Sequence, residues 1–111
     1  NVTVWGNGKA TRDFCYVEDV AEGIVDAAEK YNKSDPVNLA SGEEKTINEI
    51  ARIIKEKVGF KGDIIWDDSK PSGPPRRVIN IDKAKKEFDY NIKTKLKDGI
   101  IKTIEWYINE K

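Results

Sequence analysis

The sequence predicts an α/β fold that combines a small mixed sheet with about four helices. Two observations support this prediction: short extended segments alternate with longer segments, and in the longer ones apolar residues recur every three or four positions. The order along the chain is β-β-α-β-α-β-loop-(β)-α-α. Parallel pairing of strands across the helical crossovers is the expected arrangement. The 111 residues are enough for one domain, or for a piece of a larger one.

The first two strands are expected at residues 2–5 and 14–17. Residues 2–5 alternate apolar and polar side chains and run into Gly6-Asn7-Gly8, a tight turn. The sequence therefore predicts a hairpin that closes over residues 6–11.

Helical periodicity then predicts a helix over residues 18–31, and residues 37–40 form a short apolar strand candidate. Thr46 and Glu49 match a capping box, which predicts a helix from there to about Val58. Gly59 is placed to end that helix.

The last third of the chain contains two further strand candidates and two helices. Residues 63–66 form a strand candidate, the proline-rich residues 67–75 a loop, and residues 77–81 a short extended segment. Asp82 is expected to cap a helix over residues 83–88. A final helix opens at Thr94 or Lys95 and carries an apolar stripe.

Composition excludes several classes of protein. Twenty basic and twenty acidic residues give zero net charge, which excludes a strongly basic nucleic-acid-binding domain. No apolar run approaches the length of a membrane span, and no signal peptide is visible, so we expect a cytoplasmic protein with no membrane partner. Without histidine, and with Cys15 as the single cysteine, neither a histidine-dependent mechanism nor a zinc site is expected.

The chain is expected to be a fragment of a longer protein, because it contains no methionine and begins like the middle of a strand. It also lacks a G-x-G-x-x-G fingerprint, since Gly6-Asn7-Gly8 has no third glycine. No cofactor is therefore expected to bind this fragment, and no catalytic or metal-ligating residue is assigned in it.

Arginine is rare in the chain and concentrates outside the predicted helices. Arg12, Arg76 and Arg77 lie on predicted loops or strand starts, where binding residues are common. Arginine is well suited to bidentate phosphate contacts, and Trp5 beside a glycine turn offers a flat face for a base. These residues therefore form a candidate site for a base and its diphosphate. The alternative is that Trp5 belongs to the core and the arginines are surface charge.

Four blocks along the chain carry a family resemblance. Residues 5–21 resemble W/G-x-G-x-x-x-R-x-F-x-Y-V-x-D-x-A, and residues 37–51 resemble N-x-G-S-G-x-x-x-[ST]-I-x-E-[IL]-A. Residues 69–77 resemble the loop S-K-P-D-G-x-P-R-K, and residues 96–107 resemble a terminal S-L-x-x-G-[IL]-x-x-T-x-x-W-[FY] helix. In this order the blocks resemble the C-terminal part of an extended short-chain dehydrogenase/reductase of the NAD-dependent epimerase/dehydratase group. The loop at 69–77 resembles the GDP-L-fucose synthase-like branch.

The resemblance implies a Rossmann-type α/β fold in which residues 1–111 form a single C-terminal substrate-binding region. It also implies that an N-terminal Rossmann part, with NAD or NADP and the catalytic group, lies outside this chain. The fragment alone is then inactive. Its expected partners are a nucleotide-diphosphate sugar, the missing Rossmann part and a second copy in a homodimer.

By the same resemblance, Trp5 and Arg12 contact the nucleotide or its diphosphate, and Arg77 matches a basic substrate-binding position. Arg76 and Lys70 are weaker candidates nearby. Ser72 stands where these synthases often have an aspartate that contacts substrate. A UDP- or dTDP-sugar epimerase or dehydratase therefore stays open, as does a non-catalytic nucleotide-binding or protein-interaction module.

Overall fold

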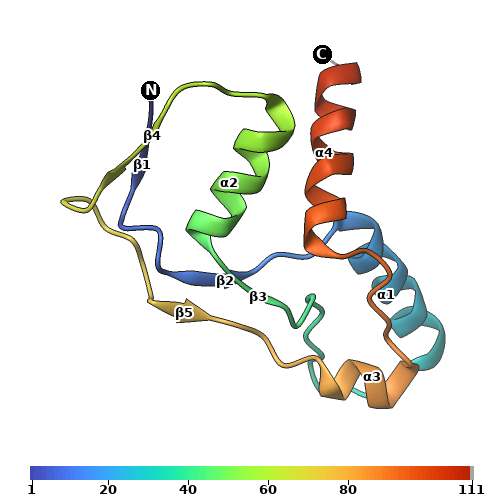
Figure 1. Ribbon diagram of the computed structural model, residues 1–111. Coiled ribbons are helices and arrows are strands. Elements are labelled where there is room, and N and C mark those ends of the chain that lie inside the picture. Colours follow the sequence, from blue (N-terminus) through green and yellow to red (C-terminus); the bar gives the residue numbers. More distant parts are fainter. Residues whose placement is uncertain (111) are drawn as a thin grey trace.

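The computed structural model describes residues 1–110, in which short strands and helices alternate (Figure 1). The elements in chain order are β1 (Val2–Trp5), β2 (Thr11–Asp13), α1 (Val17–Lys30), β3 (Glu44–Thr46), α2 (Ile47–Val58), β4 (Ile64–Asp67), β5 (Arg76–Arg77), α3 (Asp82–Phe88) and α4 (Leu96–Glu110). The prediction of an α/β fold with about four helices is confirmed.

The strands of residues 1–110 form two small sheets. Strand β1 pairs in parallel with β4, from Val2 opposite Ile64 to Trp5 opposite Asp67. The other sheet has the order β3-β2-β5, with β2 antiparallel to β3 and parallel to β5. The expected parallel pairing is confirmed, but the hairpin is wrong. The strands on either side of the glycine turn, β1 and β2, belong to different sheets. Each pairs with strands more than 30 residues away in the sequence, β1 with β4 and β2 with β3 and β5.

The helix ends follow the capping signals in the sequence. At the start of α2 the hydroxyl of Thr46 accepts a hydrogen bond of 3.0 Å from the Glu49 amide. Gly59, at φ +70°, ends the same helix in the left-handed region that glycine tolerates best. Helix α1 begins at Val17, so the strand expected at residues 14–17 does not form.

Three smaller expectations are also wrong. Residues 37–40 form no strand, since they find no strand partner within residues 1–110, and Ala40 instead accepts a 2.9 Å hydrogen bond from the Tyr90 hydroxyl. The extended segment expected at 77–81 is only the two-residue strand β5. Asp82 lies inside α3 rather than capping it, and its amide donates a 2.8 Å hydrogen bond to the side chain of Asn80.

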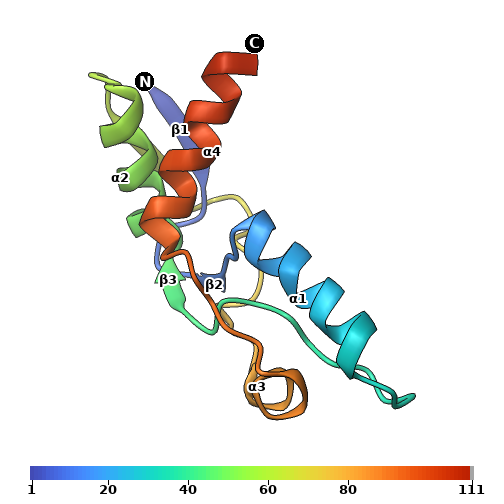
Figure 2. The ribbon, with the colours of Figure 1, turned by 90° about the vertical axis from the view of Figure 1, so that its right-hand side faces the viewer.

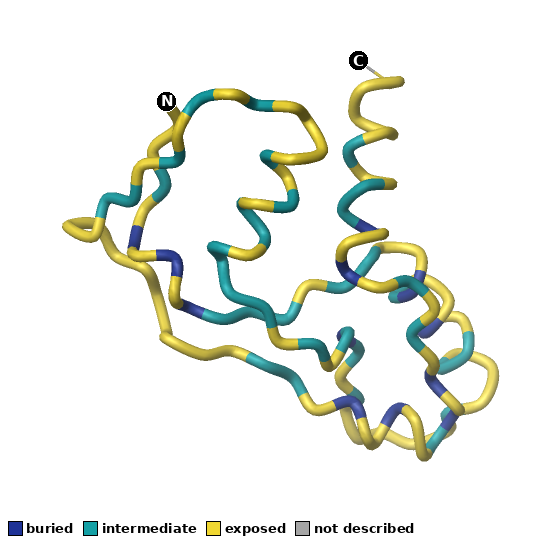
Figure 3. Tube along the Cα trace, in the orientation of Figure 1, coloured by how far each residue is buried: buried dark blue, intermediate teal, exposed yellow. Residues whose placement is uncertain are grey.

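The hydrophobic core lies at one end of the molecule, between α1 and α3. Its buried members are Ala40, Ile81, Ala84, Phe88 and Tyr90. The Phe88 and Tyr90 rings meet edge to face with centroids 6.5 Å apart, a favourable aromatic geometry. Figure 3 shows buried positions in and around α3, whereas the C-terminal half of α4 is exposed. The end that carries β1 and β4 is thus held mainly by strand pairing.

The described chain is extended and rich in exposed surface. Its radius of gyration is 16.5 Å, against about 13 Å expected for a compact domain of this length. Its accessible surface of 7894 Å² exceeds that expected for a monomer of this mass by on the order of 1,700 Å². Figure 2 shows α4 and α1 projecting from the centre in different directions. None of the helices within residues 1–110 has the length and apolar character that crossing a bilayer requires.

Candidate functional site

The candidate site lies where β1 and β4 end. Trp5 is the last residue of β1 and, at 61% exposure, presents its ring to solvent. The ammonium group of Lys70 lies 5.8 Å from the centroid of that ring, within the range of a cation–π contact. Within residues 1–110 Trp5 therefore lies outside the hydrophobic core. The ring and the lysine together form a flat surface with a positive charge beside it.

Two glycines with positive φ shape the turn after Trp5. A Cβ on Gly6, at φ +94°, would lie 2.8 Å from the Cβ of Ser72, and one on Gly8, at φ +77°, would lie 2.9 Å from the ring of Trp66. The turn therefore allows close packing against β4 and the loop that follows it. It leads into a strand, not a helix, so it does not provide the helix N-terminus on which a dinucleotide pyrophosphate rests.

Arg12 ties the loop of residues 68–75 to the sheet. From β2 its guanidinium donates hydrogen bonds to three backbone carbonyls, those of Thr11 at 2.6 Å, Pro74 at 2.7 Å and Ser72 at 3.2 Å. A guanidinium has five N–H donors, so two of them remain for a ligand. The structure thus brings Arg12 and Ser72 together and gives Arg12 a structural contact that the sequence did not predict.

The two consecutive arginines of β5 have different surroundings. Arg77 lies opposite Arg12 in the parallel register of β2 and β5. Arg76 is on the other face, where its Nε donates a 3.0 Å hydrogen bond to Glu44. That bond, together with one from the Thr11 hydroxyl at 2.7 Å, holds the pKa of Glu44 below its usual value. The positive charge of Arg76 is therefore already compensated, whereas Arg77 has no carboxylate partner within residues 1–110.

Asp13, next to Arg12, connects two of the sequence blocks. One oxygen of its carboxylate accepts hydrogen bonds from the amide and hydroxyl of Ser41, and the other accepts from the Gly42 amide at 2.9 Å. Cys15, two residues further on, has its sulfur 3.7 Å from the Tyr90 hydroxyl, and burial raises the pKa of both groups. Raised pKa values leave both groups protonated, which fits packing rather than nucleophilic chemistry.

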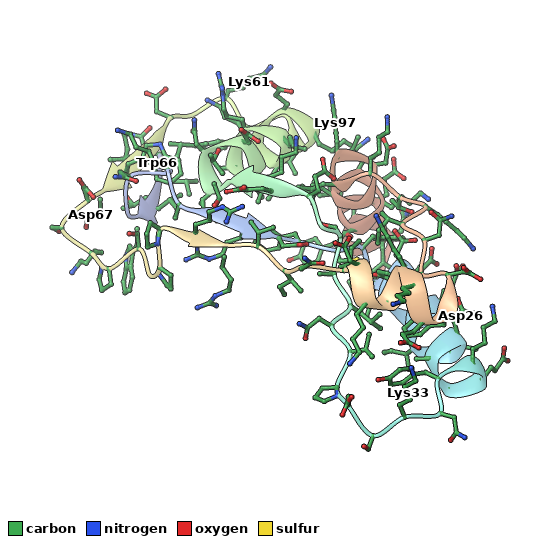
Figure 4. The ribbon with its side chains drawn as sticks, turned by 90° about the horizontal axis from the view of Figure 1, so that it is seen from below. Asp26, Lys33, Lys61, Trp66, Asp67 and Lys97 are labelled. Carbon is green, nitrogen blue, oxygen red and sulfur yellow. The ribbon has the colours of Figure 1, made fainter. Side chains whose placement is uncertain are left out.

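Figure 4 shows Trp66 and Asp67 at the end of the molecule opposite to Asp26 and Lys33. Asp67 accepts a 3.1 Å hydrogen bond from the amide of Ser69 and so starts the turn that leads into the loop. Within the part of the chain that the structure describes, no group of three or more potential metal ligands is present. The candidate site therefore consists of aromatic, basic and hydroxyl side chains.

Sequence reasoning missed Glu44 and Lys45, which belong to β3. This strand is polar throughout, so hydrophobic alternation does not reveal it. The available signal is indirect, because the capping box at Thr46 requires an extended backbone just before the helix.

Comparison with known proteins agrees with these observations. Residues 1–103 match the sequence profile of the family described as GDP-mannose 4,6 dehydratase. A probable GDP-L-fucose synthase 1 of Oryza sativa subsp. japonica is 40% identical over 107 residues, which are 96% of this chain and 32% of the relative. The chain spans about a third of the length of the curated relatives it matches first.

Solved structures show the same fold. A GDP-L-fucose synthetase from Naegleria fowleri bound to NADP superimposes with a TM-score of 0.87 at 28% identity, covering 97% of this chain and 34% of the other. A UDP-glucuronic acid 4-epimerase from Bacillus cereus, in complex with UDP-glucuronic acid and NAD, gives a TM-score of 0.85 at 25% identity, covering 98% and 35%. The match over residues 1–103 and these similarities lead to one conclusion: the chain belongs to the GDP-mannose 4,6 dehydratase family of NAD-dependent epimerases and dehydratases.

Proposed function

We propose that this chain is the nucleotide-sugar-binding part of an NAD(P)-dependent epimerase or reductase similar to GDP-L-fucose synthase. The observation that carries the proposal is the convergence around one loop of an exposed aromatic ring with Arg12, Lys70 and Arg77, cations that have no carboxylate partner within residues 1–110. The proposed substrate-binding residues lie on β1, β2 and β5 and in that loop: Trp5, Arg12, Lys70, Ser72, Arg76 and Arg77.

In this proposal the base stacks on Trp5 beside the Lys70 ammonium. Aromatic faces accept any base, so this contact supplies affinity rather than choice of base. Arg12 and Arg77 hold the diphosphate, because charge-assisted hydrogen bonds from guanidinium groups match phosphate oxygens in geometry and charge. Ser72, fixed by its contact with Gly6 and its carbonyl bond to Arg12, lines the loop beside them. Arg76 contributes only if it leaves Glu44.

We further propose that residues 1–111 are the C-terminal region of the protein and that NAD(P) and the catalytic group belong to a Rossmann part outside this chain. The excess surface and the large radius of gyration support this division, since both are expected of a part that packs against another. NAD(P), when bound, supplies the hydride chemistry of such enzymes. A homodimer and a cytoplasmic location stay predictions.

Calorimetric titration of the full-length protein with GDP tests the site. Replacing Arg77 with glutamine is expected to weaken binding by about 10- to 100-fold, the usual effect of losing a hydrogen bond from a charged group. Lys97→Gln removes the same charge from the first turn of α4 and is the matched control, expected to bind as the wild type does. Equal affinity of wild type and Arg77→Gln would contradict the proposed site.

The same titration with UDP in place of GDP separates two substrate classes. The similarity to a UDP-glucuronic acid 4-epimerase favours a UDP-sugar as the alternative to a GDP-sugar. We expect the tighter binding with GDP, because the sequence relatives matched first are GDP-L-fucose synthases. Tighter binding of UDP would change the proposed substrate from a GDP-sugar to a UDP-sugar, while the proposed binding residues would stay the same.

The inactivity of the isolated chain is tested by assaying residues 1–111 and the full-length protein side by side. Each is incubated with NAD(P) or NADPH and a panel of nucleotide sugars that includes 4-keto sugars, and the sugar products are separated by chromatography, because an epimerisation causes no net oxidation of the cofactor. Turnover is expected from the full-length protein alone. Turnover by residues 1–111 would place catalytic residues within this chain and overturn the division proposed above.

A further inference from the structure

The two faces of the sheet β3-β2-β5 carry different charge patterns. Side chains alternate between faces along a strand, so residues that pair across strands share a face. Thr11 pairs with Thr46 and Arg76, and this face also carries Asp13 and its partner Glu44. The other face carries Lys45, Arg12 and Arg77 side by side, with Arg12 in the middle. We call these three residues the basic row.

On the first face the cation Arg76 is paired with Glu44, whereas the three members of the basic row are all cations. Glu44 accepts hydrogen bonds from both Thr11 and Arg76. In the basic row, Arg12 lies directly between two other cations, an arrangement that destabilises a sheet. Its hydrogen-bond partners are neutral carbonyls, and the Arg77 side chain has no hydrogen bond or ion pair within residues 1–110. Repulsion of this kind is relieved when an anion binds across the row.

Lys45 is the member of the row that nothing in the sequence indicated. Its side chain is half buried, and its ammonium lies 3.4 Å from a carboxylate oxygen of Glu43. A half-exposed pair of this kind contributes little to stability and is screened by salt. The ammonium is therefore available to a ligand that carries more than one negative charge.

We propose that Lys45 is a third diphosphate-binding residue and that the basic row binds the diphosphate of the nucleotide sugar. This proposal rests on the proposed function and adds a residue to the same site. Neighbouring strands lie about 5 Å apart, so the long side chains of Lys45 and Arg77 reach an anion centred over Arg12 from both sides. Arg12 keeps two N–H donors for that anion while it holds the loop.

The test is calorimetric titration of the full-length protein with inorganic pyrophosphate and, separately, with GDP. Lys45→Gln is expected to weaken both by about tenfold, as expected for one partly exposed charged contact. Lys61→Gln removes an equal charge between α2 and β4, outside the sheet β3-β2-β5, and is expected to leave both affinities unchanged.

Glu43→Gln tests whether the Lys45 ammonium itself binds the anion. If Lys45 had only a structural role, this substitution would not tighten pyrophosphate binding through Lys45. It frees the Lys45 ammonium and is expected to tighten pyrophosphate binding by a few-fold. Lys45→Arg keeps the charge and is expected to restore affinity, which separates loss of contact from loss of folding. The melting temperature of each variant is recorded alongside.

The outcomes are distinguishable. If Arg77→Gln weakens binding while Lys45→Gln and Glu43→Gln leave it unchanged, the role of Lys45 is overturned and the site stands. If neither Arg77→Gln nor Lys45→Gln changes the affinity for GDP, the proposed site fails together with the basic row.

Discussion

Arg12 is expected to hold the loop of residues 68–75 against β2, and removing its guanidinium should release that loop. Arg12→Met keeps the length of the side chain and removes every donor. Two of the three lost hydrogen bonds connect to the loop, at Ser72 and Pro74. Both carbonyls belong to exposed residues that water can solvate, so we assign each bond about 1 kcal/mol, the ordinary net contribution of a hydrogen bond, rather than the larger value of a buried charged one. A total of about 2 kcal/mol corresponds to roughly 30-fold more frequent opening.

Amide hydrogen exchange in the full-length protein measures this opening. The amide of Thr11 donates to the Pro75 carbonyl at 3.0 Å, so it reports on the edge of β2 that faces the loop. The amide of Ile47 donates to Ala10 at 2.9 Å, on the other side of the same segment, and serves as the internal control. Exchange at Thr11 should rise about 30-fold, with Ile47 nearly unchanged. Unchanged exchange at Thr11, or an equal rise at both amides, would refute the reasoning.

Three further predictions concern packing and protonation in the full-length protein. Asp13→Asn should lower the free energy of unfolding by about 3 kcal/mol, because the amide nitrogen of asparagine cannot accept the hydrogen bonds that a carboxylate oxygen receives from Ser41 and Gly42. Chemical denaturation measures this free energy, and a loss below about 1 kcal/mol would contradict the prediction. Gly23→Ala should destabilise the folded protein by about 1–3 kcal/mol despite the better helix propensity of alanine, since the new Cβ would lie 2.6 Å from the Tyr90 ring. An unchanged or higher melting temperature would count against this close contact. Burial raises the pKa of Cys15 above its usual value, so its alkylation by iodoacetamide at pH 8, followed by peptide mass spectrometry, should be slower than that of glutathione and should increase as the pH is raised further; a rate equal to that of glutathione would refute it.

The long helices were predictable because their signals are local. The capping box at Thr46 and the glycine at 59 specify both ends of α2, and the structure uses both. The pairing of strands was not predictable in the same way. Residues 2–5 pair with residues 64–67, and no local feature distinguishes this parallel partner from the neighbouring strand across the glycine turn.

The candidate site was predictable as a set of residue types, but not as a geometry. Scarce arginines beside a tryptophan and a glycine turn indicated Trp5, Arg12, Arg76 and Arg77. The tie between Arg12 and the loop carbonyls depends on side-chain positions that the sequence does not reveal. Lys45 is a candidate only because the register of β3 against β2 places it opposite Arg12. The pairing of Arg76 with Glu44 depends on the same register and separates two adjacent arginines that look equivalent in the sequence.

The central claim is that this chain holds the diphosphate of a nucleotide sugar between its loop and its small sheet. A crystal structure of the full-length protein with GDP measures this directly, through the distances from the phosphate oxygens to the guanidinium of Arg77. We expect hydrogen-bond distances there, with the guanine over the Trp5 ring. A GDP molecule whose phosphates contact only residues outside this chain would contradict it.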